Sequence, residues 1–195
     1  MRKLAVLAFV TLDGVMQAPS VPEEDRSRGF RQGGWARPYW DEVMQSVGGE
    51  AMSAPYDMLF GRKTYEIFAG HWPTAPKNDP GAAMMNHATK YVATKTLTAP
   101  SWENSHVLDG DVVEAVARLK REDGSLLQIH GSQNLIQTLL AHRLIDEFRL
   151  WIFPVVVGSG KRLFETPSAA PNLMLVKSRV LSNGVVMGFY RVSEC

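Results

Sequence analysis

The chain has 195 residues, 45% of them hydrophobic and 21% charged, and its formal net charge at pH 7 is +1. A nearly neutral chain of this length without runs of like charge is typical of one soluble globular domain, and it argues against a nucleic-acid or membrane surface. The single cysteine, Cys195, cannot form an internal disulfide, so we expect one domain over residues 1–195 in the reducing cytoplasm.

The first part of the chain predicts a buried strand, a long loop and a helix. Residues 3–11 form a nearly continuous apolar run, typical of a central strand covered on both faces. This run is too short for a membrane span, and no small-residue cleavage site of a signal peptide follows it. Residues 13–38 carry several glycines and prolines and predict a loop long enough to be functional. Next, apolar side chains at helical spacing predict one face of a helix, formed by Trp40, Val43, Met44 and Val47.

The rest of the chain alternates between predicted strands and helices and ends in a hairpin. Short β-rich runs predict strands over residues 57–61, 90–94, 126–130 and 147–157. Helical patterns predict helices over residues 65–69, 111–122 and 133–142. Asn183-Gly184 between two further β-rich runs, 173–181 and 185–192, predicts an antiparallel hairpin.

This order of elements predicts an α/β fold. It has a mostly parallel central sheet, flanked by helices and completed by an antiparallel C-terminal hairpin. In open parallel sheets, ligands bind outside the carboxyl ends of the strands. The turns that follow the predicted strands are therefore where ligand-binding residues are expected.

Three such turns carry residues suited to an anionic ligand. Gly61-Arg62-Lys63-Thr64 joins a strand to a helix and brings two cations and a hydroxyl to a helix N-terminus, as a cofactor phosphate requires. The alternative is a solvated turn with Thr64 as a plain helix cap. The second turn, His130 to Asn134, offers Gly131 for close approach, Ser132 as a cap, and the side chains of Gln133 and Asn134.

The third turn, Thr94-Lys95-Thr96, places a hydroxyl and a cation where a ribose 2′-phosphate could be held, and an ordinary polar loop is the alternative. Gly158-Ser159-Gly160-Lys161-Arg162 is not a P-loop, because it lacks the first glycine and the final hydroxyl residue of that motif. The chain also has no glycine fingerprint of a Rossmann dinucleotide site and no paired metal-ligand spacing, so we expect no metal.

Few residues are suited to acid–base chemistry. Asp13 lies where the first strand ends and could face the same crevice, or it could cap a turn. Asp41 borders the apolar face of the predicted helix, whereas Glu42 points away from that face. Asp13 and Asp41 are therefore the candidate catalytic acids, with a bound water as the third option.

A series of short motifs in a fixed order resembles the dihydrofolate reductase-like family, which includes the C-terminal reductase domain of the bifunctional riboflavin-biosynthesis deaminase-reductase. The resemblance runs from about Lys3 to Val192. It rests on Thr11 to Gly14, Gly33-Gly34-Trp35, Leu59 to Glu66, Tyr91 to Leu97, His130-Gly131-Ser132, Asp146-Glu147 and Pro154 to Phe164.

The resemblance implies NADPH as cofactor, held by the same turns that the residues themselves indicate: Gly61, Arg62, Lys63, Thr64, Thr94, Lys95, Gly131 and Ser132. It also implies that residues 16–35 cover the active site, that the protein forms a homodimer, and that the reaction resembles reduction of 5-amino-6-(5-phosphoribosylamino)uracil. The chain lacks the deaminase domain of the bifunctional proteins, and it lacks the clear acidic residue and two-glycine turn of dihydrofolate reductase. A non-catalytic ligand-binding module on the same fold is the alternative function.

Overall fold

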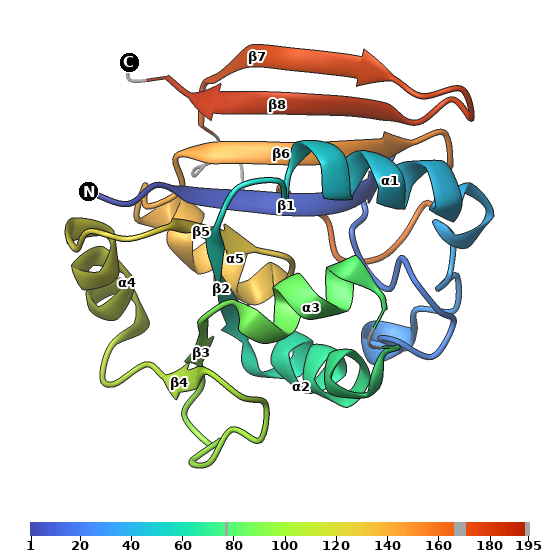
Figure 1. Cartoon of the computed structure of the whole chain (residues 1–195). Helices are drawn as coiled ribbons and strands as arrows, with labels where there is room; N and C mark the ends of the chain where they lie inside the picture. Colours follow the sequence, from blue (N-terminus) through green and yellow to red (C-terminus); the bar gives the residue numbers. More distant parts are fainter. Residues whose placement is uncertain (77, 166–170, 194–195) are drawn as a thin grey trace.

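A computed structural model describes residues 1–76, 78–165 and 171–193; Cys195 lies outside them. Within these residues, eight strands form one sheet in the order β4-β3-β2-β5-β1-β6-β8-β7 (Figure 1). The strands are β1 (Leu4–Thr11), β2 (Tyr56–Gly61), β3 (Lys90–Ala93), β4 (Ser105–Val107), β5 (Leu126–Ile129), β6 (Glu147–Phe153), β7 (Leu173–Val180) and β8 (Val186–Val192).

The sheet is parallel from β4 to β6 and antiparallel at its C-terminal edge. β1 lies in the centre, with β5 and β6 parallel to it on either side. β8 pairs antiparallel with β6, and β7 pairs antiparallel with β8. The predicted α/β fold with a C-terminal hairpin is therefore confirmed, and β1 is buried on both faces as its apolar run predicted.

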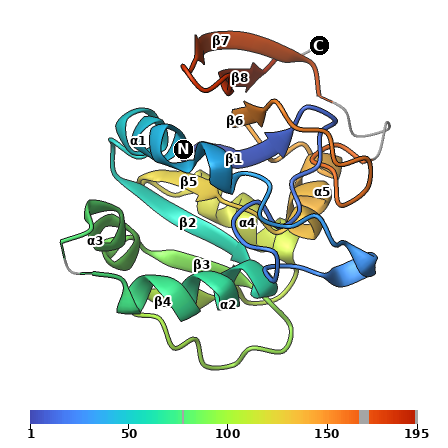
Figure 2. The same cartoon turned by 90° about the vertical axis from the view of Figure 1, so that its right-hand side faces the viewer.

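Helices cover both faces of the sheet (Figure 2). One apolar core lies beneath α1 (Trp40–Glu50), α2 (Arg62–His71) and α3 (Pro80–His87). The other lies beneath α4 (Val112–Arg121) and α5 (Gln133–Ala141). The inward side chains predicted for α5 are all buried: Leu135, Ile136, Leu139 and Leu140. The two cores cover the two faces of the sheet. The loops that follow the parallel strands therefore lie at the carboxyl ends of these strands.

Some boundaries differ from the sequence-based prediction. α2 begins at Arg62 and continues through Gly70 to His71, because a single helical glycine with open space around it costs only about 1 kcal/mol. α3 and β4 were not predicted, since both are short and have weak periodicity. β6 ends at Phe153 rather than at residue 157, because Pro154 has no N–H to donate to a strand ladder.

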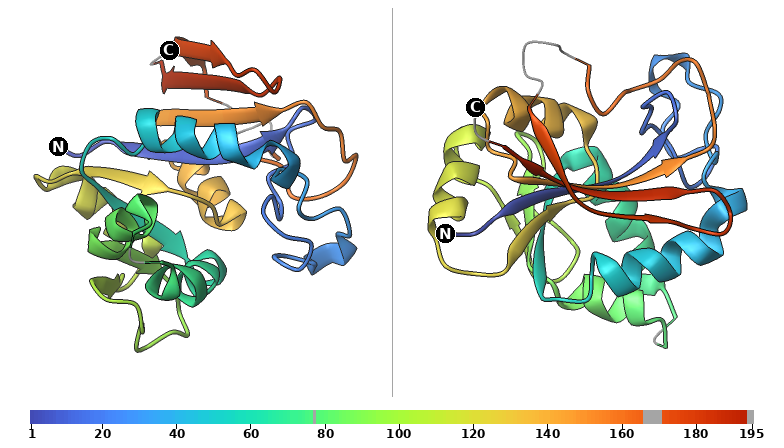
Figure 3. Two further views of the ribbon diagram at one scale, coloured as in Figure 1. Left: turned by 45° about the vertical axis from the view of Figure 1, so that its right-hand side comes forward. Right: turned by 90° about the horizontal axis from the view of Figure 1, so that it is seen from above.

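The long loop after β1 contains only two short 3-10 helices, at Ser27–Gly29 and Arg37–Tyr39. It lies beside the segment that follows β6 (Figure 3). Val15 forms an isolated antiparallel bridge with Arg162. The Met16 N–H donates to the Lys161 carbonyl at 2.9 Å, and the Leu163 N–H donates to the Gly14 carbonyl at 3.0 Å. The loop is therefore fixed to the 158–165 segment by backbone hydrogen bonds.

Candidate active site

Two glycine turns meet at the carboxyl ends of β2 and β5. The Ser132 hydroxyl donates to Thr64 Oγ1 at 2.8 Å and so joins the residue before α5 to the first turn of α2. A Cβ added to Gly61 would lie 2.4 Å from Ser132 Oγ, so only glycine permits this approach. Gly131 has a φ of +138°, a conformation that favours glycine. The structure thus brings together two turns that lie about 70 residues apart in the sequence.

The helices that start at these turns have no capping side chain. α2 begins after Gly61 and α5 after Ser132, and neither helix has an acidic residue in its first turn. Ser132 was predicted to cap α5, and this prediction is wrong. Its φ of +75° is left-handed, and its hydroxyl bonds to Thr64 instead of to a helix amide. Thr64 is the third residue of α2, so the alternative reading of it as the helix cap is also wrong.

The third predicted turn lies next to the first. Arg62 donates through Nη1 to Thr96 Oγ1 at 2.5 Å and through Nε to Glu66 Oε1 at 2.7 Å. Thr94 Oγ1 accepts the N–H groups of Thr96 and Leu97, both at 3.1 Å, and so shapes the loop. Lys95 is exposed. Two cations therefore lie beside the uncapped start of α2.

The remaining predicted cofactor residues differ in burial. Lys63 and Asn134 are exposed at the first turns of α2 and α5. Gln133 is buried, and its Oε1 has no hydrogen-bond partner among the described residues. An unpaired buried acceptor is unusual and marks a site where a further donor is expected.

Asp13 has its carboxylate fully engaged. Oδ1 accepts the Thr11 hydroxyl at 2.6 Å, and Oδ2 accepts the Gly158 N–H at 2.9 Å. The hydrogen bond from Thr11 is the main cause that lowers the pKa of Asp13, and the amides of Gly158 and Val157 add to it. The side chain therefore remains an ionised anchor between β1 and the segment after β6, which does not suit a proton donor.

Asp41 lies in the first turn of α1 and is exposed. The structure does not bring it into contact with the two glycine turns. Its neighbour Glu42 accepts hydrogen bonds from the Ser182 N–H at 2.7 Å and the Ser182 hydroxyl at 2.6 Å. Glu42 thus holds the turn of the β7–β8 hairpin.

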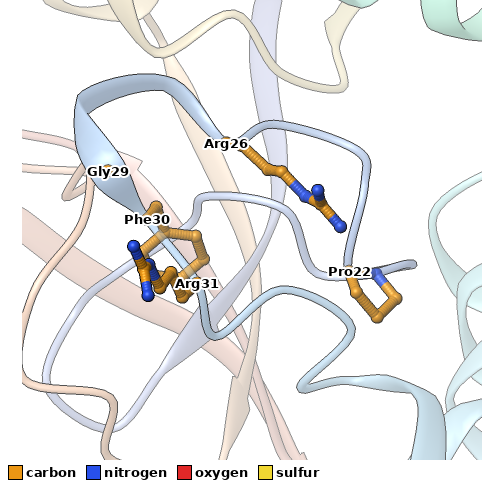
Figure 4. Close-up of a pocket in the computed structure, with 5 residues that line it drawn as sticks. All are labelled: Pro22, Arg26, Gly29, Phe30 and Arg31. Atoms are coloured by element: carbon orange, nitrogen blue, oxygen red, sulfur yellow. The ribbon is translucent and has the colours of Figure 1, made fainter.

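A surface hollow of about 480 Å³ lies within the long loop, lined by Pro22, Arg26, Gly29, Phe30 and Arg31 (Figure 4). Arg26 points toward Pro22 and pairs with Glu23, whereas Arg31 lies beside Phe30 (Figure 4). None of the predicted site residues lines this hollow. We place the site at the glycine turns, because the residues that line this hollow are all exposed except Phe30, and exposed loop residues do not form a pre-organised site.

A polar cluster that the sequence analysis missed lies next to the second turn. It consists of Tyr56, Gln128, His130 and Arg149, on the sheet face that α1, α2 and α3 cover. His130 directly precedes Gly131, and its ring lies 6.0 Å from that of Phe68 and 6.2 Å from that of Tyr56. The period-2 spacing of Gln128 and His130 was the only sequence signal of this cluster.

In the described part of the chain, no group of three or more histidine, cysteine, aspartate or glutamate side chains is arranged to hold a metal ion. None of the described helices has the length and apolar character that crossing a membrane requires.

Several known proteins are similar to this chain. The model of the RibD C-terminal domain matches residues 2–187. Two proteins of Bacillus subtilis (strain 168) that are named as uncharacterized are similar in sequence. YyaP is 34% identical over 140 residues, 68% of this chain and 72% of its own length. YwjB is 28% identical over 196 residues, 97% of this chain and 98% of its own.

Solved structures share the fold. A candidate riboflavin biosynthesis protein from Shewanella has a TM-score of 0.71 at 20% identity, over 98% of this chain and 99% of its own. A pyrimidine reductase-like protein from Corynebacterium diphtheriae has a TM-score of 0.61 at 12% identity, over 100% and 93%. Dihydrofolate reductase from Enterococcus faecalis, complexed with NADP(H), has a TM-score of 0.61 at 12% identity, over 98% and 97%.

Proposed function

The chain belongs to the family of RibD C-terminal domains, and we propose that it is an NADPH-dependent reductase of a small heterocyclic or carbonyl substrate. A reductase-type function agrees with the family and with the fold. The observation that carries the cofactor assignment is the meeting of two uncapped helix N-termini, from α2 and α5, at one pair of glycine turns.

The residues at these turns fit a dinucleotide with phosphates. The free N–H groups of two helix starts attract anions, and no acidic side chain in either first turn opposes them. Gly61 and Gly131 keep the backbone open to close approach. We assign contact with the 2′-phosphate, which distinguishes NADPH from NADH, to Arg62 and Thr96, which bond to each other, and to the exposed Lys95. Gln133 Oε1, a buried acceptor without a partner among the described residues, lies near the same turns and would accept a hydrogen bond from the cofactor.

The chemistry divides between cofactor and protein. When bound, NADPH supplies a hydride to a C=N or C=O carbon of the substrate, and a proton completes the reduction. The protein's part is to orient the substrate and to exclude water. Asp13 remains ionised, and Asp41 is exposed in the first turn of α1. We therefore propose a bound water as the immediate source of the proton.

The experiment that tests this function is a substrate screen. The purified protein is mixed with NADPH and with pterins, aminouracils and small carbonyl compounds, and loss of NADPH absorbance is followed. We expect oxidation with at least one nitrogen heterocycle. Tight NADPH binding without oxidation of any of these substrates would instead favour the alternative, a non-catalytic ligand-binding module.

We also propose that the chain acts in the cytoplasm as a homodimer, without nucleic-acid or membrane partners. β7 is an edge strand, and the hairpin face opposite α1 carries exposed apolar side chains: Leu175 is 53% exposed and Val180 is 71% exposed. Val180 pairs with Val186, so the apolar surface extends over both strands. An exposed apolar face beside an edge strand is suited to pack against the same face of a second copy about a two-fold axis.

Light scattering at several protein concentrations tests the dimer. Val180→Asp is expected to convert the dimer to a monomer, because it buries a charge in the proposed interface. Leu12→Asp is the matched control, since Leu12 is 67% exposed elsewhere on the surface. A wild-type protein that remains monomeric at all concentrations would contradict the proposal.

A further inference from the structure

The segment of residues 94–104 crosses from β3 to β4 without a helix. The structure describes all of its residues, and none of them is helical. β3 and β4 are parallel neighbours, and a connection between such strands usually contains a helix that packs on the sheet. The 94–104 segment must therefore be held in place by other contacts. It carries Lys95 and Thr96, so the groups that hold the segment also place these two side chains.

α2 contacts the 94–104 segment at two points. Arg62 Nη1 donates to Thr96 Oγ1 at 2.5 Å, and the Tyr65 hydroxyl accepts the N–H of Trp102 at 3.0 Å. Arg62 and Tyr65 are three residues apart, so they lie on the same side of the helix. Tyr65 is only 2% exposed, so water does not compete for its hydroxyl. One side of α2 thus holds the segment near its beginning and near its end (Figure 2).

The second of these points is fixed by a buried ring. Trp102 is 3% exposed, and its Nε1 donates to Asn86 Oδ1, in α3, at 2.6 Å. Lys90 Nζ lies 4.2 Å from the centre of the same ring. It donates to the carbonyl of Asn86 at 2.6 Å and to that of Glu103 at 3.1 Å. Lys90 therefore joins α3, the start of β3 and the end of the 94–104 segment.

Lys90 is an unusual side chain to find at this position, because it is completely buried. Burial lowers the pKa of Lys90 to about 8, so the ammonium is still the main form at pH 7. An apolar side chain would fill the same space without the cost of removing a charge from water. What the ammonium adds is a set of donors for backbone carbonyls and a charge against the Trp102 ring.

We propose that Tyr65 and Lys90 are positioning residues that set the preference for NADPH over NADH. They do so by holding the 94–104 segment against the start of α2, so that Lys95 and Thr96 face the 2′-phosphate. Neither Tyr65 nor Lys90 is exposed, so both act through the segment and not by touching the cofactor. This inference rests on the proposed function and names residues that determine the cofactor specificity of the same site.

The test pairs each variant with a matched control. Tyr65→Phe removes only the hydroxyl that accepts from Trp102, and Tyr91→Phe removes a hydroxyl from β3 on the face that α4 and α5 cover. Lys90→Met removes the charge but keeps an unbranched side chain. Lys120→Met does the same in α4, where Lys120 Nζ donates to the Leu144 carbonyl at 2.6 Å. Calorimetry gives the affinities for NADPH and NADH, thermal melts establish folding, and NMR follows hydrogen exchange of the Trp102 amide without cofactor.

We expect Tyr65→Phe and Lys90→Met each to lower the preference for NADPH about fivefold, while NADH affinity stays within about twofold of wild type. Both controls should keep the wild-type preference. The Trp102 amide should exchange faster in Tyr65→Phe than in the wild type or in Tyr91→Phe, because its acceptor is gone. A merely structural role would weaken both cofactors alike and would leave their ratio unchanged.

Three results would overturn the inference. They are an unchanged preference in folded Tyr65→Phe and Lys90→Met proteins, an equal loss of affinity for both cofactors, and an unchanged exchange rate of the Trp102 amide in Tyr65→Phe. A wild-type protein without any preference for NADPH would overturn the proposed cofactor assignment as well. A preference that survives in the variants would overturn this inference alone.

Discussion

Two pairs of helices on the same sheet begin in different ways. α3 and α4 start after aspartates: Asp79 accepts the N–H groups of Gly81 and Ala82, and Asp111 accepts those of Val113 and Glu114. α2 and α5 start without any side-chain cap, and their N-termini meet at the carboxyl edge of the sheet. α1 also starts without a side-chain cap, but Asp41 and Glu42 lie in its first turn, so of the uncapped α-helices in the described residues only α2 and α5 offer an anion an N-terminus without an acidic side chain.

The largest expected effect comes from breaking the contact between the two open helix starts. Gly61→Ala places a methyl group 2.4 Å from Ser132 Oγ and forces the turns apart. We expect NADPH affinity, measured by calorimetry, to fall roughly 100-fold. Gly70→Ala on the same helix is the control, because a Cβ there meets no atom within 4 Å. Equal affinities of the two variants would show that the turns do not form the site.

The long loop contains a carboxylate, that of Asp25, whose partners also lie within the chain, as those of the capping aspartates do. Asp25 accepts a hydrogen bond from Lys161 Nζ at 2.5 Å. Burial alone would raise the pKa of Asp25, but hydrogen bonds from Lys161 and Ser27 outweigh burial and lower it to about 2. Since the pKa is lowered in the folded state, the stabilisation is complete above the ordinary value of 3.8 and is lost as the pH falls toward 2.

Asp25→Asn should therefore lower the free energy of unfolding by about 2 kcal/mol at pH 7. Urea unfolding at a series of pH values measures this difference, which should shrink between about pH 4 and pH 2. NADPH affinity at pH 7 serves as the control and should not change. A stability difference that is the same at all pH values would exclude the ion pair as its cause.

A smaller effect is expected from the cations beside the open start of α2. Arg62→Ala removes a charge that lies next to Thr96. NADPH affinity should fall about tenfold and NADH affinity should change little, since only NADPH carries the 2′-phosphate. Arg121→Ala, at the end of α4, is the matched loss of charge at a remote position. If both cofactors weakened equally with Arg62→Ala, the 2′-phosphate assignment would be wrong.

The smallest effect concerns a capped helix. Asp111→Ala removes both side-chain hydrogen bonds from the start of α4. A lost cap typically costs about 1 kcal/mol of stability, so thermal unfolding should occur at a lower temperature. NADPH affinity should remain that of the wild type, because this helix start lies outside the proposed site. A marked loss of NADPH affinity in Asp111→Ala would contradict the assignment of the cofactor to the uncapped helix starts alone.

The sequence predicted the fold, and the structure brings the predicted turns of residues 61–64 and 131–134 into contact, while the role of these turns as a cofactor site stays a prediction. Strand-end glycines such as Gly61 and Gly131 are local signals, and the sheet topology that joins them follows from the alternation of elements. The partner of a side chain is not a local property. Thr11, which donates to Asp13 Oδ1, is close in the chain, but Gly158, which donates to Oδ2, is 145 residues away and could not be predicted as its partner.

The same limit explains the missed polar cluster. Gln128 lies in the apolar strand β5 and His130 directly follows it, so both resemble ordinary core residues in the sequence. Their significance depends on Ala51 and Arg149, which long-range packing alone brings next to them. The cap role predicted for Ser132 failed for a related reason. Its left-handed backbone and its contact with Thr64 arise from the meeting of two turns that the sequence does not show together.

The most direct test of the central claim is a calorimetric titration of the wild-type protein with NADPH and, separately, with NADH. Open helix starts flanked by Arg62 and Lys95 predict that NADPH binds with one site per chain and at least about tenfold more tightly than NADH. Absence of binding by both cofactors, or equal affinity for the two, would contradict the assignment of these turns as an NADPH site.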